Sequence, residues 1–199
     1  MTSRQPNTFR DEALASRLQG AAGFSLVELI AVLALGITLA GMSLMVADRA
    51  FADAEANSAM RAVSATLIEA RDTALAERRQ IEVRFVNTDQ IQLIRIEPSG
   101  VQTLVGETLL EGNNEFRVFP GVPDTPDGWG NGAGVAFGAV APPYLFTPDG
   151  SFVDNGGVPL SGTVFLGRVN QPETARAVTV FGGTGRIVAW EWDGQAWHR

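Results

Sequence analysis

The strongest hydrophobic signal in this sequence is a long apolar run near the N-terminus. From Leu29 to Ala47 there is no charged residue, and only Thr38 and Ser43 carry hydroxyl groups. As a helix rising ~1.5 Å per residue, the run covers nearly all of the ~30 Å hydrocarbon core of a bilayer. It is longer than the ~7–15 apolar residues of a signal peptide. We therefore expect a retained membrane-spanning helix over residues 24–47, after a polar segment over residues 1–23.

Helical spacing continues beyond the apolar run. Residues 49–80 contain no proline or glycine and are rich in Ala, Glu and Arg, which favour helices. Apolar residues recur there at alternating spacings of three and four, a stripe typical of a helix that docks on a sheet. The stripe consists of Met60, Val63, Leu67, Ala70 and Ala74. The pattern predicts an amphipathic helix over residues 48–80, with its charged residues on a solvated face.

Alternation with a period of two replaces the helical spacing after residue 80 and predicts a β-rich globular domain over residues 81–199. Strands are expected at 81–85, 90–96, 103–110, 115–119, 163–166, 177–181 and 186–192. Turns are expected at 87–89, 182–185 and 193–194. Residues 120–138 are dominated by Gly and Pro, which indicates a loop that is either functional or mobile. The predicted fold class is α+β, a long N-terminal helix packed on antiparallel strands.

One acidic residue, Glu28, lies at the start of the apolar run. A charge at the centre of a bilayer costs at least ~2.5–3.5 kcal/mol, so an ionisable residue there indicates a function. An alternative is an uncleaved signal anchor whose Glu28 lies among the lipid headgroups, since four residues of helix span only ~6 Å. The segment before the run has three arginines, Arg4, Arg10 and Arg17, against two acidic residues. This small positive excess favours a cytoplasmic start and translocation of everything after Ala47.

Residues 23–28, GFSLVE, resemble the processing site of type IV prepilins. The resemblance implies that a membrane peptidase cuts after Gly23 and methylates the new N-terminus at Phe24. It also implies that Glu28, then fifth in the mature chain, meets the N-terminal amine of a neighbouring subunit during filament assembly. Opposite charges that are each costly in lipid become tolerable as a pair. Residues 1–23 would be the leader peptide.

Two later motifs resemble the GspH/FimT branch of minor pseudopilins. Pro148-Asp149-Gly150 is similar to a turn of that branch, and Gly185-Arg186 is similar to part of its closing hairpin. Asp-Gly also favours a turn in any β protein. The resemblance implies a pilin-like fold and a structural role in a type II secretion system, near the tip of a periplasmic pseudopilus. It further implies a single-pass protein of the bacterial inner membrane. Its partners would be other pseudopilins or minor pilins, the prepilin peptidase, the inner-membrane assembly platform and secreted cargo.

A second interpretation is a FimT-like minor pilin of a type IV pilus that takes part in pilus assembly or DNA uptake. The resemblance to FimT implies that DNA binding goes with a basic Gly-Arg-x-Arg pattern near the C-terminus. Here Val188 stands in place of the second Arg of that pattern. The net charge of −7 also argues against nucleic acid as a partner, because phosphate contacts dominate such affinity. We therefore place this interpretation second.

An exported enzyme is the third interpretation, and the sequence gives it little support. Cysteine and lysine are absent, and the one histidine, His198, is next to the last residue. No catalytic constellation, metal site or cofactor motif is expected. Loop carboxylates could bind calcium, but turn formation is the commoner role of Asp in loops. The loop aspartates are Asp124, Asp127, Asp149 and Asp154.

The tryptophans are the remaining candidates for a binding surface. Trp190 and Trp192 share one face of an expected strand by its two-residue period. Trp129 and Trp197 lie in or beside turns. Packing in the core is the preferred interpretation for such a face, and a sticky surface for a partner is the alternative.

Overall fold

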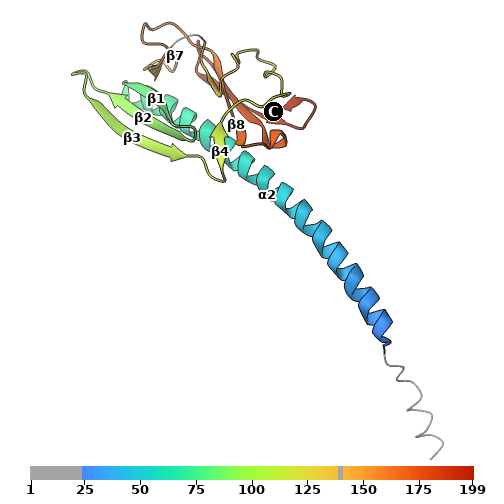
Figure 1. Ribbon diagram of the computed structural model, residues 1–199. Helices are drawn as coiled ribbons and strands as arrows, with labels where there is room; N and C mark the ends of the chain where they lie inside the picture. Colours follow the sequence, from blue (N-terminus) through green and yellow to red (C-terminus); the bar gives the residue numbers. More distant parts are fainter. Residues whose placement is uncertain (1–23, 139–140) are drawn as a thin grey trace, which may run out of the picture. The chain divides into compact units, whose positions relative to one another are not determined.

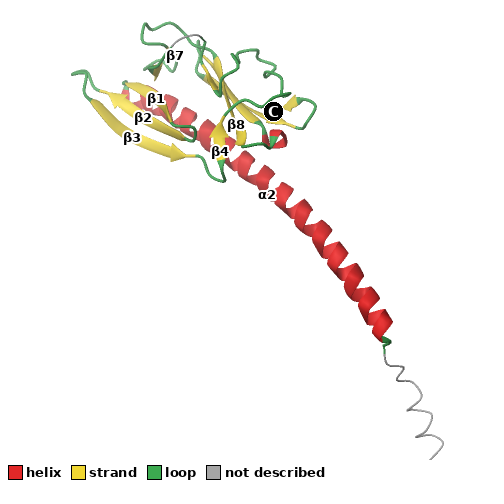
Figure 2. Cartoon of the chain, in the orientation of Figure 1, coloured by secondary structure: helices red, strands yellow, loops and turns green. Residues whose placement is uncertain are grey.

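The computed structural model describes residues 24–138 and 141–199 (Figure 1). The expected leader, including Gly23, lies outside the described residues. One long helix, α2 (Leu26–Glu77), is followed by short and medium strands (Figure 2). The chain divides into two compact units, one ending at Ala47 and the other formed by Asp48–Arg199. Helix α2 therefore has a first portion, residues 26–47, in one unit and a second portion, residues 48–77, in the other.

Helix α2 ends three residues earlier than the predicted residue 80, so that boundary was wrong. Arg78 adopts a left-handed backbone conformation with φ of 53°. The amide of Arg79 then donates a hydrogen bond to the carbonyl of Ala74 at 3.3 Å. This six-to-one bond is the Schellman closure of a helix. Glycine usually takes the left-handed position, which is why Arg78 gave no stop signal in the sequence.

The first sheet contains five antiparallel strands in the order β3-β2-β1-β6-β7. Its strands are β1 (Gln80–Val86), β2 (Gln90–Ile96), β3 (Gln102–Leu109), β6 (Tyr144–Phe146) and β7 (Phe152–Val153). The expected turn at 87–89 connects β1 to β2, with Asn87 at a φ of 53°. Because β1 also pairs with β6, the sheet joins the start of the domain to its middle.

The second sheet has the order β11-β10-β9-β8-β4, and β5 pairs with β8 beside β4. Its strands are β4 (Asn114–Phe116), β5 (Val135–Ala136), β8 (Gly162–Arg168), β9 (Arg176–Phe181), β10 (Arg186–Trp192) and β11 (Trp197–His198). A short 3₁₀ helix, η1 (Pro172–Thr174), precedes β9. The expected hairpin loops at 182–185 and around 193–194 are confirmed by the antiparallel registers of β9–β10 and β10–β11.

All seven predicted strands are present, with shifts of one or two residues at most ends. The largest error is the strand predicted at 115–119, which pairs only over Asn114–Phe116. Four further strands were missed, namely β5, β6, β7 and β11. Each has two or three residues, too few for an alternating pattern to be read. The expected α+β class, with the long helix followed by antiparallel strands, is confirmed.

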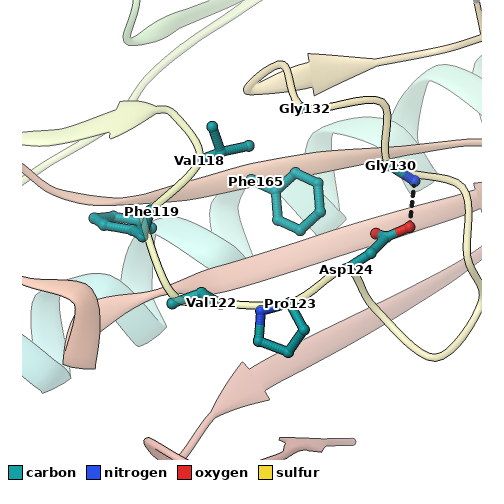
Figure 3. Close-up of a pocket in the computed structure, with 8 residues that line it drawn as sticks. All are labelled: Val118, Phe119, Val122, Pro123, Asp124, Gly130, Gly132 and Phe165. Atoms are coloured by element: carbon teal, nitrogen blue, oxygen red, sulfur yellow. Dashed lines mark hydrogen bonds between the residues drawn. The ribbon is translucent and has the colours of Figure 1, made fainter.

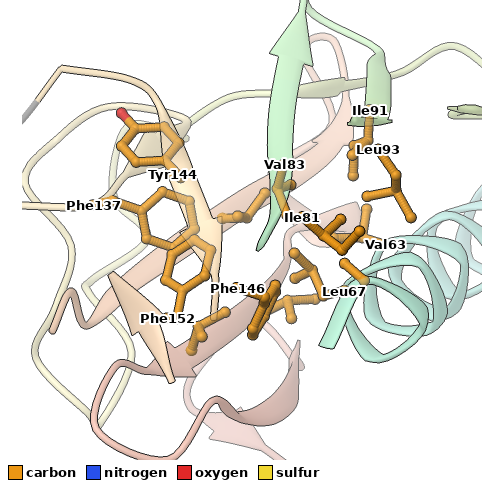
Figure 4. Packing of buried hydrophobic residues seen from close by; sticks show 14 of the residues in the cluster. Val63, Leu67, Ile81, Val83, Ile91, Leu93, Phe137, Tyr144, Phe146 and Phe152 are labelled. Carbon is orange, nitrogen blue, oxygen red and sulfur yellow. The ribbon is translucent and has the colours of Figure 1, made fainter. Parts of the chain in front are cut away.

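The main core lies between the second portion of α2 and the two sheets (Figure 4). The predicted helical stripe is confirmed, because Val63, Leu67, Ala70 and Ala74 are fully buried. Met60 is only partly buried and packs at the edge of the core. The stripe also begins earlier than predicted, with buried Ala52, Ala56 and Ala59. Strand residues that face it alternate by two, as Ile81 and Val83 do on β1.

A second cluster lies on the opposite face of the second sheet. Alternation along β8 and β9 separates the two clusters, since Val164 and Leu166 face the main core while Phe165 faces the second cluster. The second cluster consists of Phe119, Phe165, Ala175, Ala177, Trp190, Trp192 and Trp197. The interpretation of Trp190 and Trp192 as core residues is therefore confirmed.

A fully buried arginine connects the helix to the second sheet. Arg176, on β9, has no exposed surface. Its Nε donates to Asn57 Oδ1 at 2.7 Å, and its Nη2 donates to the carboxylates of Asp53 and, at 3.3 Å, Glu191. Its Nη1 donates to the carbonyl of Ala175 at 2.9 Å. A buried guanidinium needs a hydrogen-bond partner for each of its nitrogens, because the loss of its carboxylate partners would leave an uncompensated charge in the core.

Candidate functional site

Helix α2 begins with a capping arrangement that includes Glu28. The side-chain oxygen of Ser25 accepts a hydrogen bond from the backbone amide of Glu28 at 3.2 Å. Ser25 is thus the N-cap, and Glu28 is the third helical residue, the spacing of a capping box. A carboxylate in a first turn also interacts favourably with the helix dipole, by ~0.3–1 kcal/mol. The Ser-x-x-Glu spacing was visible in the sequence but was not used.

The first portion of α2 presents large apolar side chains to its surroundings. Phe24 is 81% exposed, and the side chains that follow it along the helix are also open. The exposed large apolar residues are Leu26, Val27, Leu29, Ile30, Val32, Leu33, Leu35, Ile37, Leu39, Met42 and Val46. α2 is long and apolar enough to cross a membrane. An apolar surface of this extent needs lipid or another protein to cover it.

Glu28 is exposed within this apolar segment and makes no ion pair with any described residue. The two polar side chains further along bond only to their own helix. The hydroxyl of Thr38 donates to the carbonyl of Ala34 at 2.7 Å, and that of Ser43 donates to Leu39 at 3.0 Å. Such internal bonding is what a lipid environment demands of polar groups. Glu28 differs from these two residues, because its carboxylate has no hydrogen-bond or ion-pair partner among the described residues.

The Pro148-Asp149-Gly150 motif forms the turn between β6 and β7. Asp149 Oδ1 accepts hydrogen bonds from the hydroxyl of Thr147 and, at 3.1 Å, from the amide of Ser151. These bonds hold the pKa of the Asp149 carboxyl below its ordinary value. Gly150 has a φ of 83°, a conformation that favours glycine. The motif is therefore a self-contained turn.

The structure brings this turn against the loop of the β9–β10 hairpin. The amide of Phe152 donates to the carbonyl of Gly182 at 2.8 Å. Gly185, with a φ of 60°, lies so close that a Cβ there would collide with the carbonyl of Gly150. The two motifs, read from the sequence as separate resemblances, are therefore one structural unit.

Arg71 of helix α2 lies directly beside both glycines. A Cβ at Gly185 would be 3.0 Å from Arg71 Cδ, and one at Gly150 would be 3.3 Å from Arg71 Nε. Arg71 and Arg186 both line a hollow of about 410 Å³ between the helix and the hairpin, together with Asp72. Neither arginine makes an ion pair with a described residue, and the Nε of Arg71 is buried without a hydrogen-bond partner. We refer to this hollow as the arginine hollow.

Most other arginines of the globular unit are engaged with carboxylates. Ion pairs of 4 Å or less involve Arg79, Arg84, Arg95, Arg117, Arg168 and Arg176. Val188, which stands in place of the second Arg of the Gly-Arg-x-Arg pattern considered above, packs on the second cluster instead. The helix supplies a second cation, Arg71, next to Arg186. Sequence reasoning missed this pair because the two residues are far apart along the chain.

The remaining candidate residues take part in local structure. Asp124 accepts from the amides of Thr125 and Gly130, and Asp154 accepts from those of Gly156 and Val158. These are the contacts of turn-forming aspartates. Among the described residues, no group of three acidic or histidine side chains could hold a metal ion.

Asp127 and His198 are also accounted for by hydrogen bonds. Asp127 accepts from the hydroxyl of Thr179 at 2.6 Å, and Thr179 in turn accepts from Trp190 Nε1 at 3.1 Å. His198 Nε2 lies 2.7 Å from Asp193 Oδ2 in the β10–β11 hairpin. These hydrogen bonds give Asp127 and His198 structural roles in the fold.

Comparisons with known proteins give a distant likeness. No family model matches the chain, and no curated protein matches it. Among solved structures, one of the minor pseudopilin EpsH from the type 2 secretion system of Vibrio cholerae is 14% identical, with a TM-score of 0.46. That match covers 68% of this chain and 95% of the other. A second EpsH structure from the same organism is 13% identical, with a TM-score of 0.45, covering 72% and 98% of the two chains.

Proposed function

We propose that this protein is a minor pseudopilin of a type II secretion system. It is a structural subunit, held in the bacterial inner membrane by residues 24–47, that joins a periplasmic pseudopilus at or near the tip and promotes protein secretion. The observation that carries the proposal is Glu28, an exposed carboxylate without a described ion-pair partner in the first turn of a long apolar helix.

The proposed mechanism is assembly. Cleavage after Gly23 creates an amine at Phe24, and methylation follows at the same nitrogen. Glu28 of one subunit then pairs with the Phe24 amine of its neighbour, which fixes the register of the two helices. Breaking a buried charge pair by removing one partner costs ~3–5 kcal/mol, so the pair disfavours any other register.

The other partners follow from the same role. The prepilin peptidase acts on residues 23 and 24, and an inner-membrane assembly platform adds the subunit to the filament. The globular unit, residues 48–199, faces other pseudopilins and secreted cargo on the periplasmic side. Support for this division comes from the boundary of the two compact units at Ala47 and Asp48.

The test compares Glu28→Ala and Glu28→Lys with Glu69→Ala. Glu69 is an exposed carboxylate on the second portion of α2 and is the matched control. Both Glu28 variants are expected to insert in the membrane and to keep the globular unit folded. Their incorporation into pseudopilus filaments and the amount of secreted protein are expected to fall at least tenfold. Glu69→Ala is expected to behave as wild type. Normal secretion and incorporation in both Glu28 variants would contradict the proposal.

The arginine hollow favours a second candidate function, a minor type IV pilin that binds DNA. Arg71 and Arg186 are two cations without carboxylate partners, and each could neutralise one phosphate. The net charge of −7 opposes this function.

A mobility-shift titration of the full chain in detergent with duplex DNA separates the two candidates. If both arginines contact phosphates, log K falls against log salt with a slope of about −1.8, and the double variant Arg71→Gln/Arg186→Gln abolishes that slope. Tight, arginine-dependent binding near physiological salt would rank the pilus function first. We expect no such binding.

A further inference from the structure

An apolar hollow lies over the second cluster, on the face of the second sheet away from helix α2. It has a volume of about 260 Å³ and is bounded by the segments 118–124 and 130–132. Figure 3 shows Phe165 of β8 between these two segments, with Val118 and Pro123 at either side. A water molecule takes up ~30 Å³ of the liquid, and ligand pockets usually exceed ~300 Å³. The hollow is therefore of a size for one side chain of a partner.

The walls of this hollow are held in place by hydrogen bonds. Asp124 accepts from the amide of Thr125 at 2.7 Å and from that of Gly130 at 2.9 Å, which ties the two segments together. The indole of Trp197 donates to the carbonyl of Pro123 at 2.9 Å. A hollow whose walls are already fixed loses little conformational entropy when it is filled. It is therefore suited to binding.

A second hollow of about 300 Å³ adjoins the first. Val122 lines both, and the second hollow is completed by Pro120, Pro172, Trp192 and Glu173 among others. Apolar and aromatic pockets of this kind accept the anchor side chains that dominate protein interfaces. Because the hollows share Val122, an extended segment could place neighbouring anchors in both. We call them together the paired hollows.

The charges that line the paired hollows are all acidic. Asp124 lines the first and Glu173 the second, and neither makes an ion pair with a described residue. The nearby Arg117, which lies over the ring of Phe119, is already paired with Glu115 at 3.6 Å. Complementary charge selects partners and speeds their approach. The matching occupant therefore carries positive charge.

We propose that the paired hollows bind an extended segment of a partner protein that carries two apolar side chains flanked by Lys or Arg. This surface is separate from Phe24 and Glu28. It would give the globular unit a means to select a partner, which helix pairing in the membrane does not supply. The two hollows call for apolar side chains, and their acidic lining calls for cations. An extended peptide segment can carry both, so the occupant is a peptide segment.

The test measures peptide binding to the purified full chain in detergent by tryptophan fluorescence. Trp192 lines the second hollow and Trp197 contacts Pro123, so both report on occupancy. The probe is the capped peptide Arg-Leu-Gly-Leu-Arg. The controls are Glu-Leu-Gly-Leu-Glu, which reverses the charge, and Arg-Ser-Gly-Ser-Arg, which removes the apolar anchors. A duplex DNA oligonucleotide is the fourth arm.

We expect a saturable signal with the Arg-Leu probe that weakens at high salt, and at least tenfold weaker binding of both control peptides. Val118→Glu, at the rim of the first hollow, is expected to reduce affinity at least tenfold, while Val101→Glu, an exposed valine outside the hollows, leaves it unchanged. Glu173→Gln alters an exposed side chain and is expected to weaken binding about two- to fivefold. The thermal midpoint of each variant checks folding.

Several results would overturn this proposal. They are no saturable signal, equal binding of the serine peptide, unchanged affinity in both Glu173→Gln and a folded Val118→Glu, or DNA competing at the same site. None of these arms depends on cleavage after Gly23 or on Glu28. Failure here would therefore leave the assembly proposal standing, and failure of assembly would leave this one standing.

Discussion

The two portions of helix α2 bury apolar residues in opposite ways. Before Ala47 the exposed side chains are large, such as Leu33 and Ile37, and no part of the described chain covers them. After Asp48 the fully buried positions are mostly small, such as Ala56 and Ala70. Small side chains let the helix approach the sheets closely, whereas large ones offer a wide surface to lipid. The first portion thus exposes large apolar side chains, whereas the second buries mostly small ones.

The polar side chains of the two portions also differ in their hydrogen-bond partners. In the second portion they reach other elements, as Thr66 does by bonding to Thr108 of β3 at 2.8 Å. Asp53 and Asn57 reach Arg176 of β9. In the first portion the hydroxyls bond back to their own helix. The first portion is thus complete as a helix, while the second is part of a tertiary structure.

The largest expected difference comes from matched leucine truncations. Leu67→Ala leaves a cavity in the main core and is expected to lower the free energy of unfolding by about 3–5 kcal/mol. Leu33→Ala removes an exposed side chain and is expected to change it by less than about 0.5 kcal/mol. Urea unfolding in detergent, followed by fluorescence of the tryptophans, all of which lie in the globular unit, measures both. Equal effects would show that the two portions do not differ as described.

Replacement of the buried arginine has the next largest effect. Arg176→Met is expected to cost about 3 kcal/mol, at the lower end for a broken buried pair. The cost is limited because Asp53 and Glu191 are about half exposed and regain water. Arg168→Met, which removes a looser 3.8 Å pair with Glu55, is the control and is expected to cost less than about 1 kcal/mol. The same urea titration compares them, and an equal loss for both variants would contradict the role of Arg176.

The smallest expected effect is on the pH dependence of stability, through Asp193 in the β10–β11 hairpin. Amides of Ala196 and Gln195, and then His198, stabilise the Asp193 carboxylate and lower its pKa to about 2. A carboxyl whose pKa is lower in the folded chain contributes stability above its unfolded pKa of about 3.9 and loses it as the pH falls. The stability difference between wild type and Asp193→Asn is therefore expected to shrink as the pH falls from about 5 towards 2. A difference that grows on acidification would contradict this.

The sequence was informative wherever a repeating pattern marked the structure. The period of the stripe at Val63, Leu67 and Ala70 predicted a docked helix, and alternation predicted seven of the strands. Ala52, Ala56 and Ala59 were missed because isolated alanines do not stand out as apolar positions. Short strands such as β7 were missed because two residues have no period.

The candidate site was harder to predict because its contacts join distant parts of the chain. Arg176 reads as a polar residue at the edge of a strand, and its burial depends on Asp53 and Asn57, more than a hundred residues earlier. The arginine hollow likewise needs Arg71 of the helix beside Arg186 of the hairpin. By contrast, the cap at Ser25 is local, and its spacing to Glu28 could have been found in the sequence.

The central proposal is that residues 24–47 become a membrane helix whose Glu28 pairs with a neighbour's new amine. The most direct measurement is the intact mass and N-terminal sequence of the protein extracted from the native membrane. The proposal predicts a chain that starts at N-methylated Phe24, with Glu28 in the fifth position. A purified chain that still carries residues 1–23 would have no such amine and would contradict it.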